Sequence, residues 1–572
     1  MKQSTLKWIY KVPGREKIKI LLLALVRAVN AFSGVLYALL IRSVIDSAVS
    51  GDNSSFWKYI MLSAALVVFQ ILLRAADRQL TESARSSIEN RFKTRLLETL
   101  LSRNYLSVSS VHSAEWMNRL TNDTVVVANA CTDIVPGLVS MAVKLIGALA
   151  MMFVLDARFA ALLIPLGALL ILLSLAFRKK MKALHREVQE ADGRLRVRLQ
   201  EMLGSLLMLH SFASEDKAEA GAELKMEEHR DSRMKKNAFS NFCNTGFSAA
   251  MSGMYLFCVG YCGLGILKGT ISFGTLTAMT MLVSQIQSPF VNISGILPKF
   301  YSMLSSAERL MEAEDLPEYG KEARPLDEVS DFYENTLKSL RLEDVSFAYY
   351  APSETPDQLS KAPAEAVSGL SMDIAKGQFI AFTGRSGCGK STAIKLLMCA
   401  YDPDGGRRNM ICRDGSETEL DASWRRLFAY VPQGNLLMSG TIREAVSLSS
   451  DGDTDDGRVR KALEIACADP FVNELESGLD TVLGERGTGL SEGQMQRIAI
   501  ARAVYSGSPV LLLDEVTSAL DAETERKVLE NLRSMTDKTV LIVTHREAAL
   551  DYCDKILEFT DTGAEVRNDE RR

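Results

Sequence analysis

Long apolar stretches concentrate in the first 300 of the 572 residues and restrict what this chain can fold into. A helix needs about 20 apolar residues to cross a membrane. Six candidate stretches occur, at approximately residues 20–41, 59–73, 134–155, 159–177, 245–267 and 273–297. Inside a bilayer the backbone must satisfy its own hydrogen bonds, which favours helices. We therefore predict a six-helix, all-α membrane domain over residues 1–311 and not a set of buried helices in a soluble core.

The connections between these stretches alternate in length. Those after the first, third and fifth stretch are short, and residues 156–158 form almost the whole of one. Those after the second and fourth are long and polar but keep a helical period, which predicts helices that continue far into the cytosol. Basic residues gather where the long segments leave the apolar stretches, for example at 178–182 and 233–236. The positive-inside rule therefore predicts that both chain termini are cytosolic.

Two basic residues interrupt the apolar stretches. Charge at the centre of a bilayer costs at least about 2.5 kcal/mol, so Arg27 and Lys144 need an explanation. They could line a hydrated cavity of positive character, which would suit an anionic or amphiphilic cargo. Alternatively, Arg27 reaches the inner interface and Lys144 bonds to a neighbouring helix. The sequence leaves both interpretations open.

Charge and cysteine usage exclude two classes of site and mark the N-terminus. The formal net charge of −5 gives no support for nucleic-acid binding. The nine cysteines are scattered, without a CxxC pair or a metal-ligand spacing, which suits thiols that face the cytosol. Residues 8–10 are aromatic or aliphatic and lie among lysines. This pattern predicts a short N-terminal helix on the inner membrane surface.

An acidic segment separates the apolar half from the rest of the chain. Residues 312–338 lack a sustained apolar period, and we interpret them as a linker. In the second domain, residues 339–572, the octapeptide GRSGCGKS lies between an apolar strand and a helix, as a phosphate-binding loop requires. Backbone N–H groups and the helix N-terminus would hold the phosphates, with Lys390 at the β- and γ-phosphates and Ser391 on Mg²⁺. The predicted contacts are Gly384, Arg385, Ser386, Gly387, Cys388, Gly389, Lys390, Ser391 and Thr392.

Further motifs follow this loop in a fixed order. They are FAYVPQ ending at Gln433, LSEGQ at 490–494, VLLLDE ending at Asp514 and Glu515, SALD at 518–521, and His545 after the apolar run TVLIVT. In this order the motifs resemble the ATPase domain of ATP-binding cassette (ABC) proteins. The resemblance implies an α/β P-loop ATPase domain that binds ATP and Mg²⁺.

The resemblance also implies a role for single residues. Gln433 would contribute to Mg²⁺ and to the attacking water, and Asp514 would hold Mg²⁺ through water. Glu515 would be the general base that orients and polarises that water. His545 would contact the γ-phosphate, and with Lys390 it completes the expected catalytic set. Tyr349 occupies the place where the family stacks an aromatic ring on adenine, and Tyr350 is the alternative if the register differs by one residue.

The LSEGQ element implies a second subunit. In the family this element completes the ATP site of another copy, with Ser491, Gly493 and Gln494 as the expected contacts. The sequence departs from the commonest form at Glu492, whose carboxylate could repel a phosphate unless it points away or finds a cation. We expect it to point away, so that Glu492→Gly changes the ATPase rate less than about tenfold.

The apolar half resembles the membrane domain of ABC exporters of the half-transporter kind. There, short coupling helices touch an ATPase domain, and the matching stretches here lie near 111–115 and 206–215. The segment TVLGERG, residues 481–487, resembles one that exporters place near these helices. The expected architecture is therefore multidomain, with a helical membrane domain followed by an ABC ATPase domain.

The implied function is ATP-driven export by alternating access of a dimer. The cargo would be lipidic, drug-like or peptide, taken from the cytosol or the inner leaflet, and folds of this kind do not specify which. All the hydrolysis residues occur in one chain, which favours a homodimer. A heterodimer with a degenerate partner and a lipid flippase remain alternatives. We expect a multi-pass protein of the bacterial cell membrane that contacts lipids and no nucleic acid.

Overall fold

The computed structural model describes residues 2–320, 322–349, 364–434, 437–448, 454–484, 489–560 and 563–566. Internal contacts divide the chain into two compact units. The first unit comprises residues 1–97 and 117–313, and the second comprises residues 98–116 and 314–572. The second unit therefore includes a short piece of the N-terminal half.

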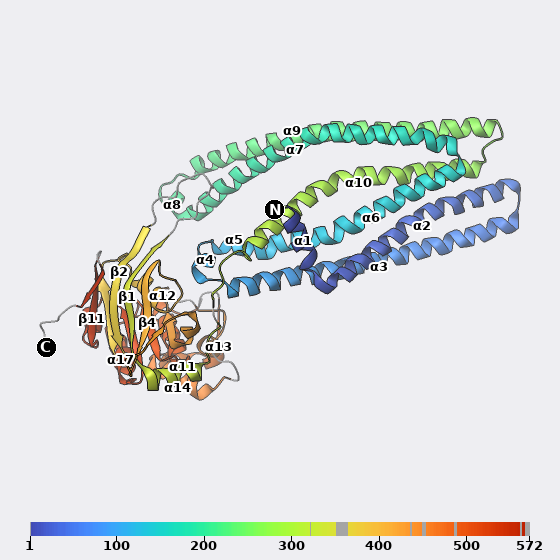
Figure 1. The fold of residues 1–572 in the computed structure, drawn as a ribbon. Helices are drawn as coiled ribbons and strands as arrows, with labels where there is room; N and C mark the ends of the chain where they lie inside the picture. Colours follow the sequence, from blue (N-terminus) through green and yellow to red (C-terminus); the bar gives the residue numbers. More distant parts are fainter. Residues whose placement is uncertain are drawn as a thin grey trace. The chain divides into compact units, whose positions relative to one another are not determined.

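Six long helices build the first unit (Figure 1). They are α2 (Lys17–Ser50), α3 (Asn53–Ser102), α6 (Thr124–Leu155), α7 (Ala157–Gly204), α9 (Glu215–Leu267) and α10 (Phe273–Glu312). Shorter pieces are α1 (Lys2–Lys11), η1 (Gly14–Glu16), η2 (Arg119–Asp123) and α8 (Leu206–Ser211), while α4 (Tyr105–Ser109) and most of α5 (Ser113–Asn118) belong to the second unit. The helices α7 and α9 pack against each other, while α2, α6 and α10 form a second group.

Length and composition make several of these helices membrane-spanning candidates. Four are long and apolar enough, within Gly14–Ser50, Asn53–Ser102, Ser113–Leu155 and Glu215–Leu267, and Phe273–Ile286 is a shorter apolar helix. The predicted span 159–177 falls in α7, where the side chains of 162–176 lie outside the described residues. Large apolar side chains on these helices, such as Leu72, Val154 and Leu256, face outward. Apolar surface of this extent is suited to lipid.

Local signals set the short turns between the long helices. Gly51 ends α2 with a φ of 76°, in the left-handed region that favours glycine. The carboxylate of Asp156 caps α7 and accepts hydrogen bonds from the backbone N–H groups of Arg158 and Phe159. Ser272 caps α10 in the same way, accepting from the N–H of Thr275. These caps explain why consecutive long helices are joined by so few residues.

Arg27 has a partner within the first unit. Its Nε donates to Asp77 Oδ1 at 2.8 Å, and a second nitrogen donates to Thr81 Oγ1 at 3.1 Å. Both partners lie on α3, so the guanidinium joins α2 to α3. Lys144 is half-buried on α6 and forms no hydrogen bond or ion pair with the described side chains. The structure thus gives Arg27 an interhelical ion pair, which neither interpretation of the sequence included.

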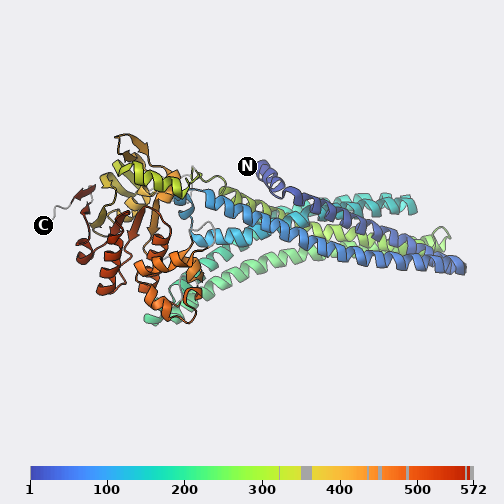
Figure 2. The same ribbon diagram turned by 90° about the horizontal axis from the view of Figure 1, so that it is seen from below.

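The second unit contains two main sheets (Figure 2). Its strands are β1 (Leu337–Tyr349), β2 (Ala364–Ala375), β3 (Phe379–Gly384), β4 (Gly405–Cys412), β5 (Glu417–Glu419), β6 (Phe428–Val431), β7 (Gly440–Thr441), β8 (Val482–Leu483), β9 (Val510–Asp514), β10 (Thr539–Val543), β11 (Lys555–Thr560) and β12 (Gly563–Val566). A six-stranded sheet has the order β12-β11-β3-β10-β9-β6, and an antiparallel sheet has the order β2-β1-β4-β5. Strands β11, β3, β10, β9 and β6 run parallel, so their carboxyl ends share one edge.

Helices and short helical turns connect these strands. They are α11 (Leu326–Asp331), η3 (Phe332–Thr336), α12 (Lys390–Leu397), η4 (Ala422–Leu427), α13 (Ile442–Val446), α14 (Asp456–Ile465), α15 (Asp469–Glu474), η5 (Gly478–Asp480), α16 (Glu492–Tyr505), α17 (Ala522–Ser534) and α18 (Glu547–Leu550). Alternate residues of the central strands enter two cores: Phe379 and Ala381 pack in one, Ile380 and Phe382 in the other. Both faces of the parallel sheet are covered, which explains its continuous apolar strands.

Part of the predicted linker is different in the structure. Residues 326–336 form α11 and the π-helical turn η3, and β1 already begins at Leu337. Val329, Tyr333 and Leu337 are fully buried in the core of the second unit, and the Tyr333 hydroxyl lies 2.9 Å from Thr539 Oγ1. These three residues are spaced four apart, but the acidic residues between them make this apolar period difficult to recognise in the sequence. The linker prediction 312–338 therefore needs correction from residue 326 onward.

Candidate functional site

Four strand ends bring the predicted site residues to one edge of the parallel sheet. The phosphate-binding loop follows β3, Gln433 follows β6, Asp514 ends β9 and His545 follows β10. The carboxyl edge of an open parallel sheet is where ligands of α/β proteins bind. The parallel pairing of β3, β10, β9 and β6 thus gathers residues that are more than 150 positions apart in the chain, such as Lys390 and His545.

The phosphate-binding loop needs its glycines. Gly384 has a φ of 129° and Gly389 a φ of 93°, and a Cβ at either position would approach a backbone oxygen to 2.4 Å, that of Phe559 or Ala366. The loop leads into α12, whose first residue is Lys390. Arg385, Ser386 and Gly387 are exposed, and Cys388 and Ser391 are half-buried. A loop of this shape presents N–H groups and a helix N-terminus to an anion.

Lys390 is buried, and its ammonium is held by the loop. The Nζ atom donates to the carbonyl oxygens of Gly384 at 2.9 Å and Arg385 at 2.8 Å, and it lies 3.8 Å from Cys388 Sγ. None of these partners carries a formal negative charge. The cation is therefore available to phosphate oxygens that enter the loop.

Asp514 is oriented by a tyrosine that the sequence motifs did not mark as a site residue. The carboxylate is 2% exposed, and its Oδ2 accepts a hydrogen bond from the Tyr430 hydroxyl at 3.2 Å. Burial, together with Asp514, raises the pKa of Tyr430, which keeps this hydroxyl a donor. The other oxygen, Oδ1, is buried and has no hydrogen-bond partner among the described residues. A buried acceptor of this kind fits a site for a hydrated Mg²⁺.

Gln433, Glu515 and His545 meet at this edge. Gln433 Nε2 donates to Glu515 Oε2 at 2.7 Å, and His545 Nε2 lies 3.7 Å from Glu515 Oε1. Glu515 has a φ of 53°, a left-handed conformation that is uncommon for glutamate, and its N–H donates to the carbonyl of Val543 at 3.2 Å. The carboxylate remains partly open to solvent. This arrangement can hold a carboxylate against a water molecule and accept its proton.

Tyr349 lies beside the phosphate-binding loop. Its hydroxyl is 3.1 Å from Thr392 Oγ1, on α12. The ring is 38% exposed, so one part of it can receive a flat ligand. The structure thus brings the predicted adenine-binding residue and the predicted phosphate-binding residue Thr392 together.

The LSEGQ element starts helix α16 in the same unit. Ser491 Oγ accepts from the N–H of Gln494 at 3.3 Å, and Gln494 Oε1 accepts from the N–H of Ser491 at 2.9 Å, which is a capping box. Glu492 is exposed in the first helical turn, where a carboxylate is favourable to the helix dipole. Gly493 has no room for a Cβ, which would come within 2.9 Å of the Ala519 carbonyl oxygen. Ser491 and Gln494 form no hydrogen bond with Lys390, Glu515 or His545 in the described part of the chain.

Two further residues fix the SALD segment. Buried Gln496 donates to Ser518 Oγ at 3.1 Å and accepts from the N–H of Ala519 at 3.1 Å. Arg546 donates to the Ser518 and Leu520 carbonyl oxygens and to the buried Glu525. Arg546 follows His545 directly, and Gln496 lies two residues after the signature element. In the sequence, only their proximity to motif residues could have marked Gln496 and Arg546 as parts of the site.

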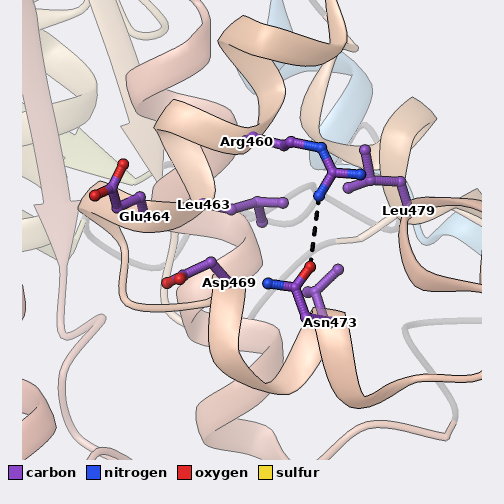
Figure 3. Close-up of a pocket in the computed structure, with 7 residues that line it drawn as sticks. Arg460, Leu463, Glu464, Asp469, Asn473 and Leu479 are labelled. Carbon is purple, nitrogen blue, oxygen red and sulfur yellow. Dashed lines mark hydrogen bonds between the residues drawn. The ribbon is translucent and has the colours of Figure 1, made fainter.

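One pocket of about 160 Å³ lies among α14, α15 and η5 (Figure 3). Its lining residues are Arg460, Leu463, Glu464, Asp469, Val472, Asn473 and Leu479. Arg460 donates to Asn473 Oδ1 at 3.4 Å across it. None of the predicted ATP-site residues lines this pocket, so it is separate from the edge of the sheet.

The fold and this site define a class: a phosphate-binding-loop ATPase joined in one chain to a helical membrane domain. Comparison with known proteins identifies the family. Residues 18–290 match the family of the ABC transporter transmembrane region, and residues 367–518 match the ABC transporter family. The matches together cover most of the chain and come in the order predicted from the sequence.

Comparisons with whole proteins lead to the same family as the two family matches. ABC transporter B family member 1 of Dictyostelium discoideum is 30% identical over 464 residues, which are 80% of this chain and 48% of that protein. The chain thus spans about half the length of that relative. The ATP-dependent lipid A-core flippase of Aliivibrio fischeri is 26% identical over 535 residues, covering 92% of this chain and 88% of the flippase. The solved structure of a bacterial Atm1-family ABC exporter with ATP bound has a TM-score of 0.76 at 20% identity, covering 96% and 94% of the two chains, and shows the shared fold.

This chain belongs to the ABC exporters. It is a multi-pass membrane protein in which an N-terminal membrane domain is fused to a C-terminal ATPase domain, the arrangement of a half-transporter. The ATPase domain binds ATP and is coupled to transport. The predictions of family, fold class and ATP-driven export are therefore confirmed. Residues 485–487 of the predicted exporter segment lie outside the described residues.

Proposed function

We propose that this protein exports a lipidic or amphiphilic cargo as a dimer, and that the carboxylate of Glu515 is the general base of its ATPase. The observation that carries the proposal is the position of this carboxylate between Gln433 Nε2 and His545 Nε2 at the strand ends. Phosphoryl transfer depends mostly on positioning and electrostatics, which such a rigid edge can supply.

Each predicted residue has a role in this scheme. Lys390 exchanges its two loop carbonyls for β- and γ-phosphate oxygens. Ser391, Gln433 and Asp514 would hold Mg²⁺, Asp514 through water, and the ion would neutralise the charge of the phosphates. Gln433 also orients the water that Glu515 deprotonates, and His545 steadies the γ-phosphate. Tyr349 stacks on adenine.

A second subunit completes the site in this proposal. Ser491 is exposed, and because its oxygen accepts from Gln494, its O–H remains able to donate to a phosphate. Gly493 and Gln494 lie beside it at the start of α16, whose dipole also favours an anion. We infer a homodimer, because Lys390, Gln433, Asp514, Glu515 and His545 all occur in one chain. A heterodimer with a degenerate partner is the alternative.

The relatives support a membrane-derived cargo. The flippase of Aliivibrio fischeri matches nearly the whole chain, which makes lipid flipping the second candidate function. Bacterial relatives and the basic residues at the cytosolic ends of the long helices support a bacterial inner-membrane protein with cytosolic termini. Peptide and drug-like cargo remain to be tested beside lipids.

The test uses the purified full chain in liposomes of phosphatidylethanolamine and phosphatidylglycerol. Phosphate release is compared for the wild type, Glu515→Gln, and Glu547→Gln as a control at a nearby exposed glutamate. We expect Glu515→Gln to lose at least about 100-fold in rate while still binding ATP, and Glu547→Gln to lose none. Turnover that persists in Glu515→Gln contradicts the catalytic assignment.

The same liposomes distinguish the cargo and the assembly. Stimulation of wild-type ATPase is measured with labelled lipids, peptides and hydrophobic dyes, and lipid movement between leaflets is followed by quenching. Stimulation by lipid together with ATP-dependent movement of that lipid supports a flippase. A strictly monomeric particle with ATP bound contradicts the dimer.

A further inference from the structure

Residues 98–116 of the N-terminal half belong to the second unit, where hydrogen bonds hold them next to Tyr401. Tyr319 N–H donates to the Ser102 carbonyl at 3.0 Å, and Asn104 N–H donates to the Pro317 carbonyl at 2.9 Å. Asn104 also caps α4 and its Nδ2 lies 3.4 Å from Asp402 Oδ2. These bonds hold α4 against the residue that directly follows Tyr401.

Four aromatic rings join α4 to the predicted adenine-binding residue; we call them the aromatic cluster. Tyr105 on α4 stacks on Tyr401, with centroids 6.1 Å apart and planes at 19°. Tyr401 stacks on Phe347 at 5.1 Å and meets Tyr349 edge to face at 6.0 Å and 89°. Phe347 meets Tyr349 at 5.1 Å and 88°. Stacked and edge-to-face pairs at these separations are attractive.

Tyr401 is the fixed member of the aromatic cluster. It is 4% exposed, whereas Tyr105 is 49% exposed and Tyr349 is 38% exposed. Arg408 Nη1 donates to the Tyr401 carbonyl at 2.6 Å and Nη2 donates to Asp402 Oδ1 at 2.9 Å. One guanidinium therefore holds Tyr401 and also Asp402, the residue that binds α4. A shift of α4 changes the packing of Tyr105 on the Tyr401 ring, and the Tyr401 ring contacts Tyr349.

We propose that Tyr401 is a positioning residue that couples the docking of helix α4 to the ring of Tyr349, so that a nucleotide with an aromatic base binds more tightly when α4 is docked. This rests on the proposed role of Tyr349 in stacking on adenine. Thermodynamic linkage makes the coupling reciprocal: base binding also stabilises the docked position of α4. The Lys390 ammonium is not part of this coupling, since no ring of the cluster holds it in the described part of the chain; at the phosphate end the Tyr349 hydroxyl lies 3.1 Å from Thr392 Oγ1.

The experiment compares two ligands that share phosphates and differ in the base. Dissociation constants for Mg-ATP and Mg-tripolyphosphate are measured on the full chain for wild type, Tyr105→Leu, Tyr401→Leu and the double variant. We expect each single variant to weaken ATP binding about threefold and to leave tripolyphosphate binding unchanged. We expect the double variant to equal the single variants, because both remove the same connection.

A conservative variant and a control separate packing from coupling. Tyr105→Phe keeps its ring and should retain wild-type ATP affinity. Leu101→Ala removes an exposed side chain of the same segment outside the aromatic cluster and should have no effect. Equal weakening of ATP and tripolyphosphate, or additive losses in the double variant, would overturn the proposal.

Tyr349→Leu separates a failure of the proposed adenine contact from a failure of the proposed coupling through Tyr401. If it weakens ATP about tenfold but not tripolyphosphate, Tyr349 is the base-binding residue, and the Tyr105 and Tyr401 variants then decide the coupling alone. If Tyr349→Leu leaves ATP binding unchanged, the proposed adenine contact is wrong, and the coupling is overturned with it.

Discussion

The edge of the parallel sheet and the start of helix α16 both suit a phosphate, but they satisfy their polar groups differently. At the sheet edge, side chains from different strands hold one another, as Gln433 and His545 do with Glu515. At α16, the hydrogen bonds of Ser491 and Gln494 to described residues stay within one helical turn. The first arrangement needs the whole sheet, while the second forms wherever α16 forms.

This difference indicates which half of the ATP site is complete. The sheet edge holds its carboxylates and its lysine in place before any ligand is present. The turn at Ser491 is exposed and keeps a free hydroxyl donor, as expected for a surface that meets another molecule. Three substitutions test the comparison, from the largest expected effect to the smallest.

Ser491→Ala should have the largest effect. It removes the proposed phosphate donor, and hydrogen bonds to charged groups contribute enough to slow hydrolysis about 10- to 100-fold. ATP affinity of the isolated subunit should not change, because the sheet edge is intact. Phosphate release and ATP binding are measured on the same preparation.

Thr441→Ala is the matched control for Ser491→Ala. Thr441 and Glu444 form the same capping box at the start of α13. Its removal should cost about 1 kcal/mol of stability and leave the ATPase rate within about twofold. If both variants slow hydrolysis equally, Ser491 acts only as a helix cap.

Tyr430→Phe should have an intermediate effect. It removes the donor to Asp514 Oδ2 and frees the carboxylate to rotate. We expect the Mg²⁺ concentration for half-maximal ATPase to rise about fivefold, with little change in the rate at saturating Mg²⁺. The measurement is a Mg²⁺ titration at saturating ATP.

A second tyrosine provides the control for Tyr430→Phe. Tyr333→Phe removes another buried hydroxyl, paired with Thr539, and should lower thermal stability without moving the Mg²⁺ midpoint. An unchanged midpoint in Tyr430→Phe would show that Asp514 does not depend on this hydrogen bond.

Glu492→Gly should have a smaller effect on the ATPase rate than Ser491→Ala. The carboxylate is exposed in the first turn of α16 and has no hydrogen bond among the described residues, so the ATPase rate should change less than about tenfold. Glu523→Gly, in the first turn of α17, controls for helix destabilisation. A larger change confined to Glu492→Gly would mean that this carboxylate tunes the second half of the site.

The sequence by itself determined the long apolar helices, the phosphate-binding loop and the order of the motifs. All three are local patterns: an apolar run, a strand–loop–helix, or a few adjacent residues. The family could be recognised for the same reason. The helical turn at 326–336 was missed because charged residues dominate its composition and its burial depends on the β-sheets behind it.

Only the tertiary structure decided which residues meet. Arg27 finds Asp77 50 residues away, Gln433 finds Glu515 82 residues away, and Tyr105 stacks on Tyr401 from the other half of the chain. Such pairs depend on strand order, parallel register and helix packing, which no local period contains. The sequence named the chemical groups of the ATP site, and only the packing of strands and helices placed the Tyr430 hydroxyl against Asp514 and the Tyr401 ring against Tyr349.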